Sequence, residues 1–156
     1  MYYDETAKGY EELHGEEQRK KLRIISDYLN VKNDDKLLDV GCGPGYTSEF
    51  FNCKIMGIDP SQELLANCSF EAILGKAEEL PFKDNEFDVV ISVSAIQNFD
   101  DIKKGLQEIK RVGKNNFALS ILKRSSKREL VEKLILDLFN LNKQVEEDKD
   151  IIFFCE

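Results

Sequence analysis

A glycine-rich loop and an aspartate that follows it are the residues best suited to hold a ligand. Gly41, Gly43 and Gly45 alternate with other residues directly after a short apolar segment. Because glycine has no Cβ atom, the backbone can turn sharply there and approach a ligand closely. Asp59, twenty residues after Asp39, ends the next apolar segment. A carboxylate at that place can accept hydrogen bonds from both hydroxyls of a ribose. We therefore expect a nucleoside-binding site.

The spacing of the glycines favours one class of nucleoside over another. The dinucleotide-binding pattern G-x-G-x-x-G would place its third glycine at position 46, where this chain has Tyr46. NAD is therefore less favoured than S-adenosylmethionine, which has no pyrophosphate to bind at a helix N-terminus. For the loop taken alone, a purely structural tight turn remains the alternative.

These residues need a sheet whose strands end at one common edge. Short apolar segments alternate with segments whose apolar residues recur at helical spacing. The expected strands cover 36–40, 54–58, 70–74, 87–93 and 117–122, followed by a closing hairpin of 142–145 and 151–155. The expected helices cover 16–30, 46–51, 62–67, 101–112 and 126–139. Ser126 and Glu129 are expected to form a capping box for the last helix, and Gly113 to end the one before it.

The alternation of strands and helices predicts the fold class. It indicates right-handed βαβ units, which build a parallel sheet with helices on both faces. We expect an α/β fold: a Rossmann-like three-layer sandwich whose mostly parallel sheet gains a C-terminal antiparallel hairpin strand. The 156 residues fit one domain. Within it, 1–35 would form an N-terminal lid or helix segment and 36–156 the cofactor-binding core.

Composition and charge argue against several other classes of protein. A formal net charge of -8 opposes autonomous binding to nucleic acid. The first residues are polar and no run of about 18 apolar residues occurs, so we expect no membrane insertion, no signal peptide and a cytoplasmic location. The four cysteines contain no Cys-x-x-Cys pair and His14 is the single histidine, so we expect no metal site.

Three segments of the chain carry a resemblance to a known family. They are LLDVGCGPG, GIDPSQELL and GKAEELPFKDNEFDVVISVSAIQNF. In order and spacing they closely resemble the successive motifs of class I S-adenosylmethionine-dependent methyltransferases of the type 11 group. The resemblance covers about residues 36–122, and YYDETAKGYEELHGEEQ is similar to the lead-in of that group. It implies a methyltransferase with S-adenosylmethionine as its cofactor.

The resemblance also implies which residues would contact the cofactor. They are Asp39, Gly41, Gly43, Gly45, Asp59, Pro60, Ala77, Glu78, Ser92 and Ser94. Asp39, Gly41 and Gly43 would line the methionine moiety, and Asp59 would bind the ribose.

The adenine end of the cofactor is less well defined by the resemblance. Ala77 and Glu78 would lie beside the adenine, and Ser92 to Ser94 would form the floor of the pocket. Relatives commonly have an acidic residue before the Ala-Glu pair, where this chain has Lys76. Glu78 or backbone atoms could accept the adenine amino group instead, and a solvated Lys76 is the alternative reading.

Methyl transfer requires little acid–base machinery. It is a direct displacement at a sulfonium-activated carbon, so positioning and desolvation supply most of the catalysis. Gln97 and Asn98, in the loop where the acceptor should enter, are candidate catalytic residues because their amides donate and accept hydrogen bonds. Helix capping and loop closure are the alternatives for both.

The N-terminal segment offers a further candidate. His14 could act as a base if this segment folds over the pocket as a lid, although exposure on a loop is the alternative. Tyr2, Tyr3 and Tyr10 would cover the cofactor in the same lid, or would pack against the core instead.

The sequence leaves the methyl acceptor and the oligomeric state open. The string ISVSAIQNF also resembles a eukaryotic methyltransferase that modifies guanine N7 in small-subunit ribosomal RNA and works with a small zinc-binding activator subunit. The first hypothesis is thus an enzyme acting on a small molecule, or on RNA or protein with such a partner. The second is a non-catalytic S-adenosylmethionine-binding or scaffold module, and the third a nucleotide-dependent oxidoreductase.

Overall fold

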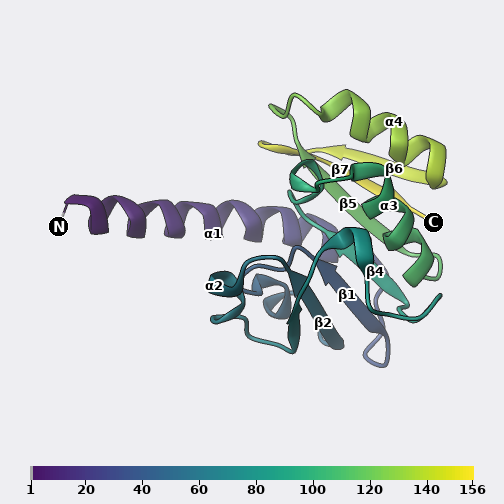
Figure 1. Ribbon diagram of the computed structural model, residues 1–156, viewed down its shortest axis with the longest axis horizontal. Helices are drawn as coiled ribbons and strands as arrows, with labels where there is room; N and C mark the ends of the chain where they lie inside the picture. Colours follow the sequence, from purple (N-terminus) through teal and green to yellow (C-terminus); the bar gives the residue numbers. More distant parts are fainter. Residues whose placement is uncertain (1) are drawn as a thin grey trace.

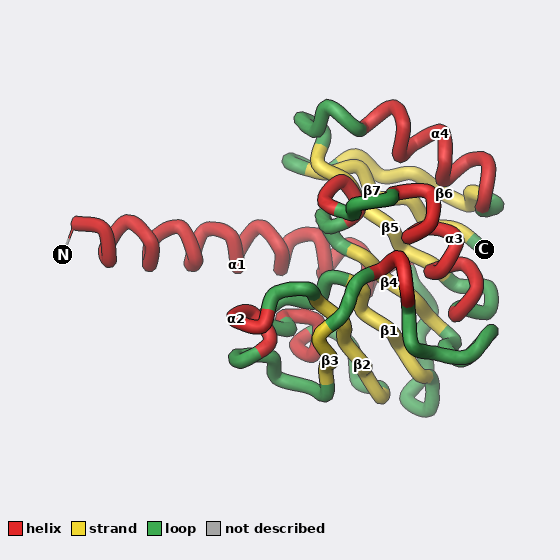
Figure 2. Tube along the Cα trace, in the orientation of Figure 1, coloured by secondary structure: helices red, strands yellow, loops and turns green. Residues whose placement is uncertain are grey.

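The chain forms a seven-stranded sheet with helices on both faces (Figure 1; Figure 2). The computed structural model describes the backbone of residues 2–156 and the side chains of residues 12–156. No helix within this part of the chain is long and apolar enough to cross a membrane. The elements in chain order are α1 (Tyr2–Tyr28), β1 (Lys36–Val40), η1 (Tyr46–Glu49), β2 (Lys54–Asp59), α2 (Gln62–Leu65), β3 (Ala72–Leu74), η2 (Ala77–Glu79), β4 (Val89–Ser92), η3 (Ile96–Asn98), α3 (Ile102–Val112), β5 (Phe117–Leu122), α4 (Arg128–Leu138), β6 (Leu141–Glu146) and β7 (Asp150–Cys155).

The order and direction of the strands create one functional edge. The sheet has the order β3-β2-β1-β4-β5-β7-β6, and β1 to β5 are parallel to one another. β7 is antiparallel to β5, so its first residue, Asp150, lies beside Leu122 at the edge where the parallel strands end. The order reverses between β1 and β4, and such a switch point opens a crevice at the carboxyl ends of the strands. The predicted fold, including the C-terminal antiparallel hairpin, is confirmed.

The core is split into two apolar clusters, one on each face of the sheet. Alternate residues of β4 belong to different clusters: Val89 and Ile91 face α1, and Val90 faces α3 and α4. Strands buried on both faces are expected to be almost continuously apolar. This explains why the sequence of β4 and its neighbours lacks polar alternation. One cluster is completed by Leu106 and Ile109 of α3 and by Val131 and Ile135 of α4. The other is completed by Leu22 and Ile25 of α1 and by Leu29, which follows α1.

Helix α1 is longer than the sequence pattern indicated. It begins at Tyr2 and not near residue 16. The added turns contain no proline and are rich in good helix formers, which outweigh a cost of about 1 kcal/mol for a glycine inside a helix. Gly15 has a packing reason, because a Cβ atom there would lie only 3.0 Å from Oη of Tyr46. The first half of α1 runs beyond the edge of the sheet (Figure 1).

The expected start of the last helix was wrong by two residues. α4 begins at Arg128 with Lys127 as its N-cap, and Lys127 contributes no side-chain capping hydrogen bond. The serine that bonds to the backbone there is Ser125, whose Oγ accepts from the Lys127 N–H at 3.1 Å. Ser126 and Glu129 therefore form no capping box. Hydrogen bonds from the backbone to a serine in a turn compete with N-capping, and here the bond within the turn, to Ser125, is the one that forms.

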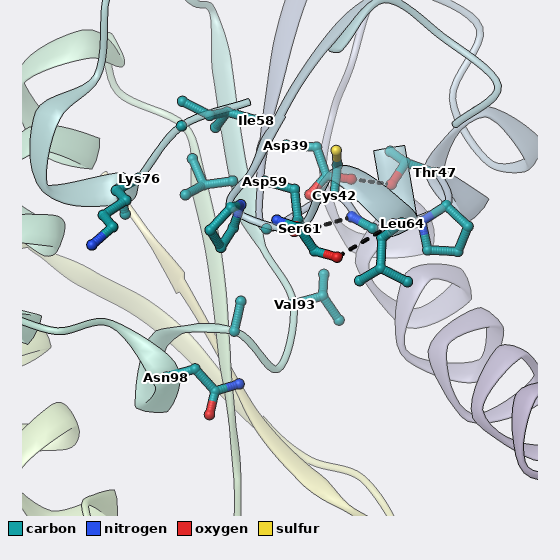
Figure 3. A pocket seen from close by; sticks show the side chains of 18 of the residues that line it. Asp39, Cys42, Thr47, Ile58, Asp59, Ser61, Leu64, Lys76, Val93 and Asn98 are labelled. Atoms are coloured by element: carbon teal, nitrogen blue, oxygen red, sulfur yellow. Dashed lines mark hydrogen bonds between the residues drawn. The ribbon is translucent and has the colours of Figure 1, made fainter. Parts of the chain in front are cut away.

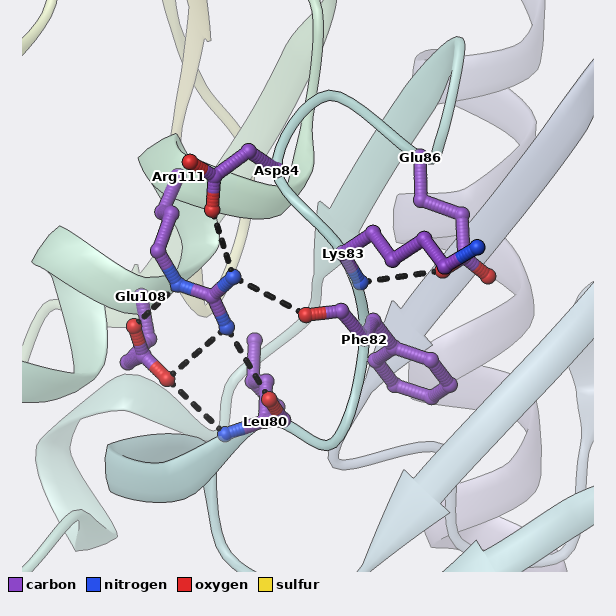
Figure 4. Close-up of polar contacts among 7 residues, drawn as sticks. All are labelled: Leu80, Phe82, Lys83, Asp84, Glu86, Glu108 and Arg111. Atoms are coloured by element: carbon purple, nitrogen blue, oxygen red, sulfur yellow. Dashed lines mark hydrogen bonds and ion pairs between the residues drawn. The ribbon is translucent and has the colours of Figure 1, made fainter.

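Arg111 holds the long connection between η2 and β4, residues 80–88 and called the crossing below, against α3 (Figure 4). Its guanidinium donates to the carbonyl oxygens of Leu80 at 3.0 Å and Phe82 at 2.9 Å, and to the Asp84 carboxylate at 2.8 Å. It also pairs with Glu108 at 2.6 Å, and this contact lowers the pKa of the Glu108 carboxyl. Glu108 in turn accepts from the Leu80 N–H at 3.0 Å. The crossing, which follows one wall of the site, is thereby anchored.

Replacing Arg111 with Met should lower the free energy of unfolding by about 2 kcal/mol, because two carbonyl groups and two carboxylates lose a charged donor at a partly exposed site. Urea unfolding followed by circular dichroism measures the change. Arg128→Met is the control, since it removes a partly exposed ion pair with Glu132 between neighbouring turns of α4. That change should cost less than about 0.5 kcal/mol. Equal losses in the two variants would show that the Arg111 contacts do not hold the crossing.

Candidate functional site

A cavity of about 1170 Å³ opens at the carboxyl ends of β1, β2, β3 and β4. Figure 3 shows Lys76 and Asn98 on the opposite side of this cavity from Thr47 and Leu64. The residues that line it are His14, Gln18, Leu22, Asp39, Val40, Gly41, Cys42, Gly43, Pro44, Tyr46, Thr47, Ile58, Asp59, Pro60, Ser61, Leu64, Asn67, Gly75, Lys76, Ala77, Glu78, Val93, Ala95, Asn98, Phe99 and Asp100. The cavity therefore lies at the switch point of the sheet, where the sequence predicted a ligand.

The glycine loop adopts a backbone that only glycine enters readily. Gly41, Gly43 and Gly45 have φ angles of 82°, 52° and 83°, all in the left-handed region. A Cβ atom on Gly41 would lie 2.6 Å from Ala95, and one on Gly45 would lie 2.9 Å from Cys68. A Cβ atom on Gly43 would meet only a Leu64 methyl group at 3.9 Å. Gly43 thus faces the open cavity, whereas Gly45 lies outside the cavity lining.

Asp59 braces this loop from the end of β2. Its two carboxylate oxygens accept hydrogen bonds from the backbone N–H groups of Gly43 and Ser61, each at 2.9 Å. Asp59 is only 6% exposed. Each carboxylate oxygen has a further lone pair, so Asp59 can accept additional hydrogen bonds from a ligand. The residue predicted to contact a ribose is also the residue that sets the shape of the loop.

Asp39 lies deep in the cavity wall at the end of β1. The Thr47 hydroxyl donates a hydrogen bond to its carboxylate. Burial raises the pKa of Asp39 to about 7, the Thr47 hydrogen bond lowers it, and the nearby charge of Asp59 raises it further. Asp39 therefore changes its protonation state near neutral pH, and a cation in the cavity would favour the ionised form.

The charged side chains of the cavity wall after β3, Lys76 and Glu78, are bonded to other residues of the protein. Lys76 forms an exposed ion pair with Asp100 at 2.9 Å. One carboxylate oxygen of Glu78 accepts from the backbone N–H of Asp101, at the start of α3, at 2.9 Å. Glu78 thus supports the neighbouring helix with one oxygen. Lys76 is exposed to solvent, as its alternative reading expected, and it is paired with Asp100. Ala77 and the backbone around Gly75 remain as the cavity surface of this wall.

The loop after β4 divides its residues between the cavity and the interior. Asn98 lines the cavity, as do Val93 and Ala95. Ser92 and Gln97 lie outside the lining, contrary to expectation. The Ser92 hydroxyl donates to the Val40 carbonyl at 2.8 Å, and the Gln97 side-chain amide donates to the Ser94 carbonyl at 2.7 Å.

Ser94 also lies outside the cavity lining. Its hydroxyl is already bonded to Lys21 and Asp150. Val93 and Ala95 line the cavity in place of Ser92 and Ser94, whose hydroxyls are bonded inside the protein.

Helix α1 supplies a wall that the sequence analysis mostly missed. His14, Gln18 and Leu22 line the cavity from one stripe of the helix. Their i, i+4, i+8 spacing is the signal that could have revealed them. His14 is exposed, but it lies in helix α1 and not on a loop, as the alternative had expected. Its role as a base stays a prediction. The side chains of Tyr2, Tyr3 and Tyr10 lie outside the described residues, so their covering role stays a prediction.

Several known proteins with similar sequences are methyltransferases. Residues 38–121 match a family described as a methyltransferase domain. Demethylmenaquinone methyltransferase from Thermotoga maritima is 30% identical over 135 residues, which cover 77% of this chain and 58% of that protein. The crystal structure of the YcgJ protein from Bacillus subtilis matches with a TM-score of 0.62 at 26% identity, over 67% of this chain and 51% of that one. The chain spans about half the length of the curated relatives it matches.

A further solved structure matches over nearly the whole chain. It is a complex between the Haloferax volcanii Trm112 methyltransferase activator and a putative methyltransferase. The TM-score is 0.77 at 18% identity, and the match covers 98% of this chain and 94% of that one. At this identity the match shows a shared fold.

Gly43→Ala should weaken the binding of S-adenosylmethionine at least about tenfold while the fold persists. The new methyl group would enter the open cavity, and its left-handed backbone would cost about 1–2 kcal/mol of stability. Titration calorimetry and thermal melting measure the two effects. Asn85→Ala is the matched control, because Asn85 has a φ of 55° on an exposed turn outside the cavity lining. It should lose stability without losing affinity. Equal affinities in the two variants would mean that Gly43 does not face the ligand.

Proposed function

Since the chain belongs to the methyltransferase domain family, the class I S-adenosylmethionine-dependent methyltransferases, we propose that its cavity binds S-adenosylmethionine and transfers the methyl group to an acceptor. The observation that carries this proposal is the buried Asp59 carboxylate, which lies in the cavity and is bonded to the glycine loop. The Asp59 carboxylate can accept hydrogen bonds from a ribose, and the glycine loop beside it offers a backbone surface that a ligand can approach closely. These are the two features that a nucleoside cofactor requires at this edge of the sheet.

The charges of the cavity support a cationic ligand. S-adenosylmethionine carries a sulfonium and an ammonium group. Asp39 and Asp59 line the end of the cavity near the glycine loop. We assign the methionine moiety to Asp39, Gly41 and Gly43, and the ribose to Asp59. Gly45 would act only through the shape of the loop.

The adenine would lie between Pro60 and the wall after β3. Ala77 offers a small apolar surface there, and the backbone near Gly75 offers polar groups. Because Glu78 already accepts from Asp101, backbone atoms are better placed than its carboxylate to pair with the adenine amino group. Lys76 and Asp100 would border the adenine edge as an ion pair.

The acceptor would enter between α1 and the loop after β4. A lone pair of the acceptor attacks the methyl carbon, the bond from carbon to sulfur breaks, and the sulfur keeps the bonding electrons as a neutral thioether. Correct alignment and exclusion of water supply most of the rate enhancement of such a displacement. Asn98 and His14 are the polar side chains of this half that could orient an acceptor or take its proton.

The two alternative functions differ in what the cavity would bind. A non-catalytic module would bind S-adenosylmethionine without turnover, and an oxidoreductase would bind NAD. NAD is less well supported, because Tyr46 lies in the lining where a pyrophosphate-binding loop would carry its third glycine. Calorimetry with S-adenosylmethionine, S-adenosylhomocysteine and NAD separates the classes.

A small activator subunit is the partner that we propose if the acceptor is RNA or a protein of the translation apparatus. The net charge of -8 opposes binding to phosphate, and a partner could supply cationic surface. The fold-level match to a protein solved with the Trm112 activator supports this proposal. Capture of bound proteins from the native organism, followed by transfer assays with and without them, tests it. Robust turnover on RNA by the isolated chain at physiological salt would refute it.

Asp59→Asn should weaken S-adenosylmethionine binding by about 10- to 100-fold, the range for losing hydrogen bonds to a charged group. One of the two backbone N–H groups that Asp59 holds also loses its acceptor. Calorimetry gives the affinity, and melting curves give the folded state. Glu63→Gln is the control, because it removes an exposed carboxylate from the neighbouring helix α2. An Asp59 variant that is folded and binds with unchanged affinity would contradict the assignment.

The affinity for S-adenosylmethionine should rise with pH between about 6 and 8, by at most about tenfold per pH unit below the pKa of Asp39. Asp39 has its pKa raised to about 7 and must lose its proton to attract the cationic cofactor.

The same pKa shift affects stability. In the folded protein without cofactor, Asp39 keeps a proton that it releases in the unfolded chain. The contribution of Asp39 to the free energy of unfolding should therefore fall as the pH rises from 3.8 to about 7.

Calorimetry in buffers of different ionisation enthalpy measures the proton release at each pH. The neutral variant Asp39→Asn should bind with an affinity that varies less with pH. A wild-type affinity that is constant over this range would exclude ionisation of Asp39 from the binding step.

A further inference from the structure

Two charged side chains from opposite ends of the sequence are buried together behind the acceptor half of the cavity. Lys21 of α1 is 1% exposed and Asp150 of β7 is 0% exposed. Lys21 Nζ lies 2.9 Å from Asp150 Oδ1 as an ion pair. Lys21 also donates a hydrogen bond to Ser94 Oγ at 2.8 Å. Neither charged residue lines the cavity, so the site described above does not use them directly.

The same cluster fixes an unusual backbone conformation at Ser94. Ser94 has a φ of 55°, a left-handed value that costs a serine about 1–2 kcal/mol. Its hydroxyl donates to Asp150, and its backbone N–H donates to Ser120 Oγ at 3.0 Å. Ser120 donates in turn to Asp150 at 2.8 Å. A strained residue persists where its surroundings determine its conformation. The contacts of the Ser94 hydroxyl and N–H lead to Asp150, and its carbonyl accepts from Gln97.

The neighbours of this cluster along the chain are cavity residues. Ser94 lies between Val93 and Ala95, which line the cavity, and Lys21 precedes Leu22, which lines it from α1. Any shift of the cluster therefore moves both walls. The antiparallel direction of β7 makes this possible, because it brings Asp150 to the edge where the parallel strands end.

Stability alone does not require a buried ion pair at this place. Withdrawing two charges from water costs free energy that their attraction only partly offsets, and apolar residues of similar size are often as stable. The pair instead fixes the orientation of Ser94, because Lys21 and Asp150 both make hydrogen bonds of defined geometry to its hydroxyl. The glycine loop and Asp59 are held by separate bonds that do not involve the cluster.

We propose that Lys21 and Asp150 are positioning residues for methyl transfer: through Ser94 they fix helix α1 and the loop of residues 93–99 as the two walls between which the acceptor is aligned. The proposal rests on the function proposed above, because it assigns these walls to the acceptor. The cofactor half of the cavity is independent of the pair.

The test uses the double variant Lys21→Met/Asp150→Asn, which removes both charges, preserves approximate size and leaves no unpaired buried charge. The matched control is Arg19→Met/Glu49→Gln. It removes an exposed ion pair of 3.0 Å between the same helix and η1. Amide hydrogen exchange is measured by NMR on both variants and the wild type, with and without S-adenosylmethionine. The informative amides are those of Ser94, Asn98 and Phe99, each of which is hydrogen bonded.

Exchange at these three amides should accelerate at least about tenfold in the Lys21/Asp150 variant and stay unchanged in the control. The affinity for S-adenosylmethionine, measured by calorimetry, should change less than about threefold in both variants. Unchanged exchange at the loop would overturn the proposal, as would an equal acceleration across the central strands, because the pair would then serve only global stability.

Two further outcomes separate this proposal from the proposed function. A loss of cofactor affinity of tenfold or more in the Lys21/Asp150 variant would overturn the independence of the two halves. A wild-type protein that binds no S-adenosylmethionine would refute the proposed function and the methyl-transfer role with it. The exchange rates would still report whether the pair holds the loop.

Discussion

The Asp59 carboxylate joins three parts of the site through two hydrogen bonds. It links the end of β2 to the glycine loop after β1 and to the first turn of α2, through the N–H groups of Gly43 and Ser61. The left-handed glycines of that loop need such an external anchor, because their backbone lies outside any regular element. Since Asp59 also lines the cavity, a ligand that bonds to it contacts the group that shapes its own binding surface.

The two halves of the cavity are supported by different kinds of interaction. The half near the glycine loop depends on backbone conformation and on contacts between residues close in sequence, such as Thr47 with Asp39. The half near α1 depends on side chains that are far apart in the chain, because Lys21 of α1 pairs with Asp150 of the last strand. The bonds of this pair and those that Asp59 makes to the glycine loop share no residue.

The parts of this arrangement that the sequence predicted are those with a local signal. The apolar run of β4, the glycine loop and Asp59 each reflect a requirement of the backbone at their own position, and all were located correctly. Gly113 was expected to end α3, and it does so as the C-cap residue, with a φ of -97°. A Cβ atom there would lie 2.5 Å from the ring of Phe117, four residues along the chain, and 2.8 Å from Val90 of β4. The contact with Val90 is one that no local pattern contains.

The same limit explains the serine positions that were assigned to the cavity. Ser94 was placed there because it follows β4, and its true partners are Lys21, Ser120 and Asp150. A lysine on an otherwise amphipathic helix reads as solvent-exposed, since nothing nearby in the sequence shows that a carboxylate from the last strand will reach it. Tertiary pairing of charges is thus the main feature that sequence reasoning could not supply.

Under the proposed function, the charges of the cavity also bear on the order of events during transfer. S-adenosylmethionine loses its sulfonium charge when the methyl group leaves, so the negatively charged cavity favours the substrate form of the cofactor over the product form. Burial places the pKa of Asp39 at about 7 without a ligand, and a nearby cation lowers it. Once the methyl group has left, the sulfonium charge is gone, so the ionised form of Asp39 would lose the charge that favours it.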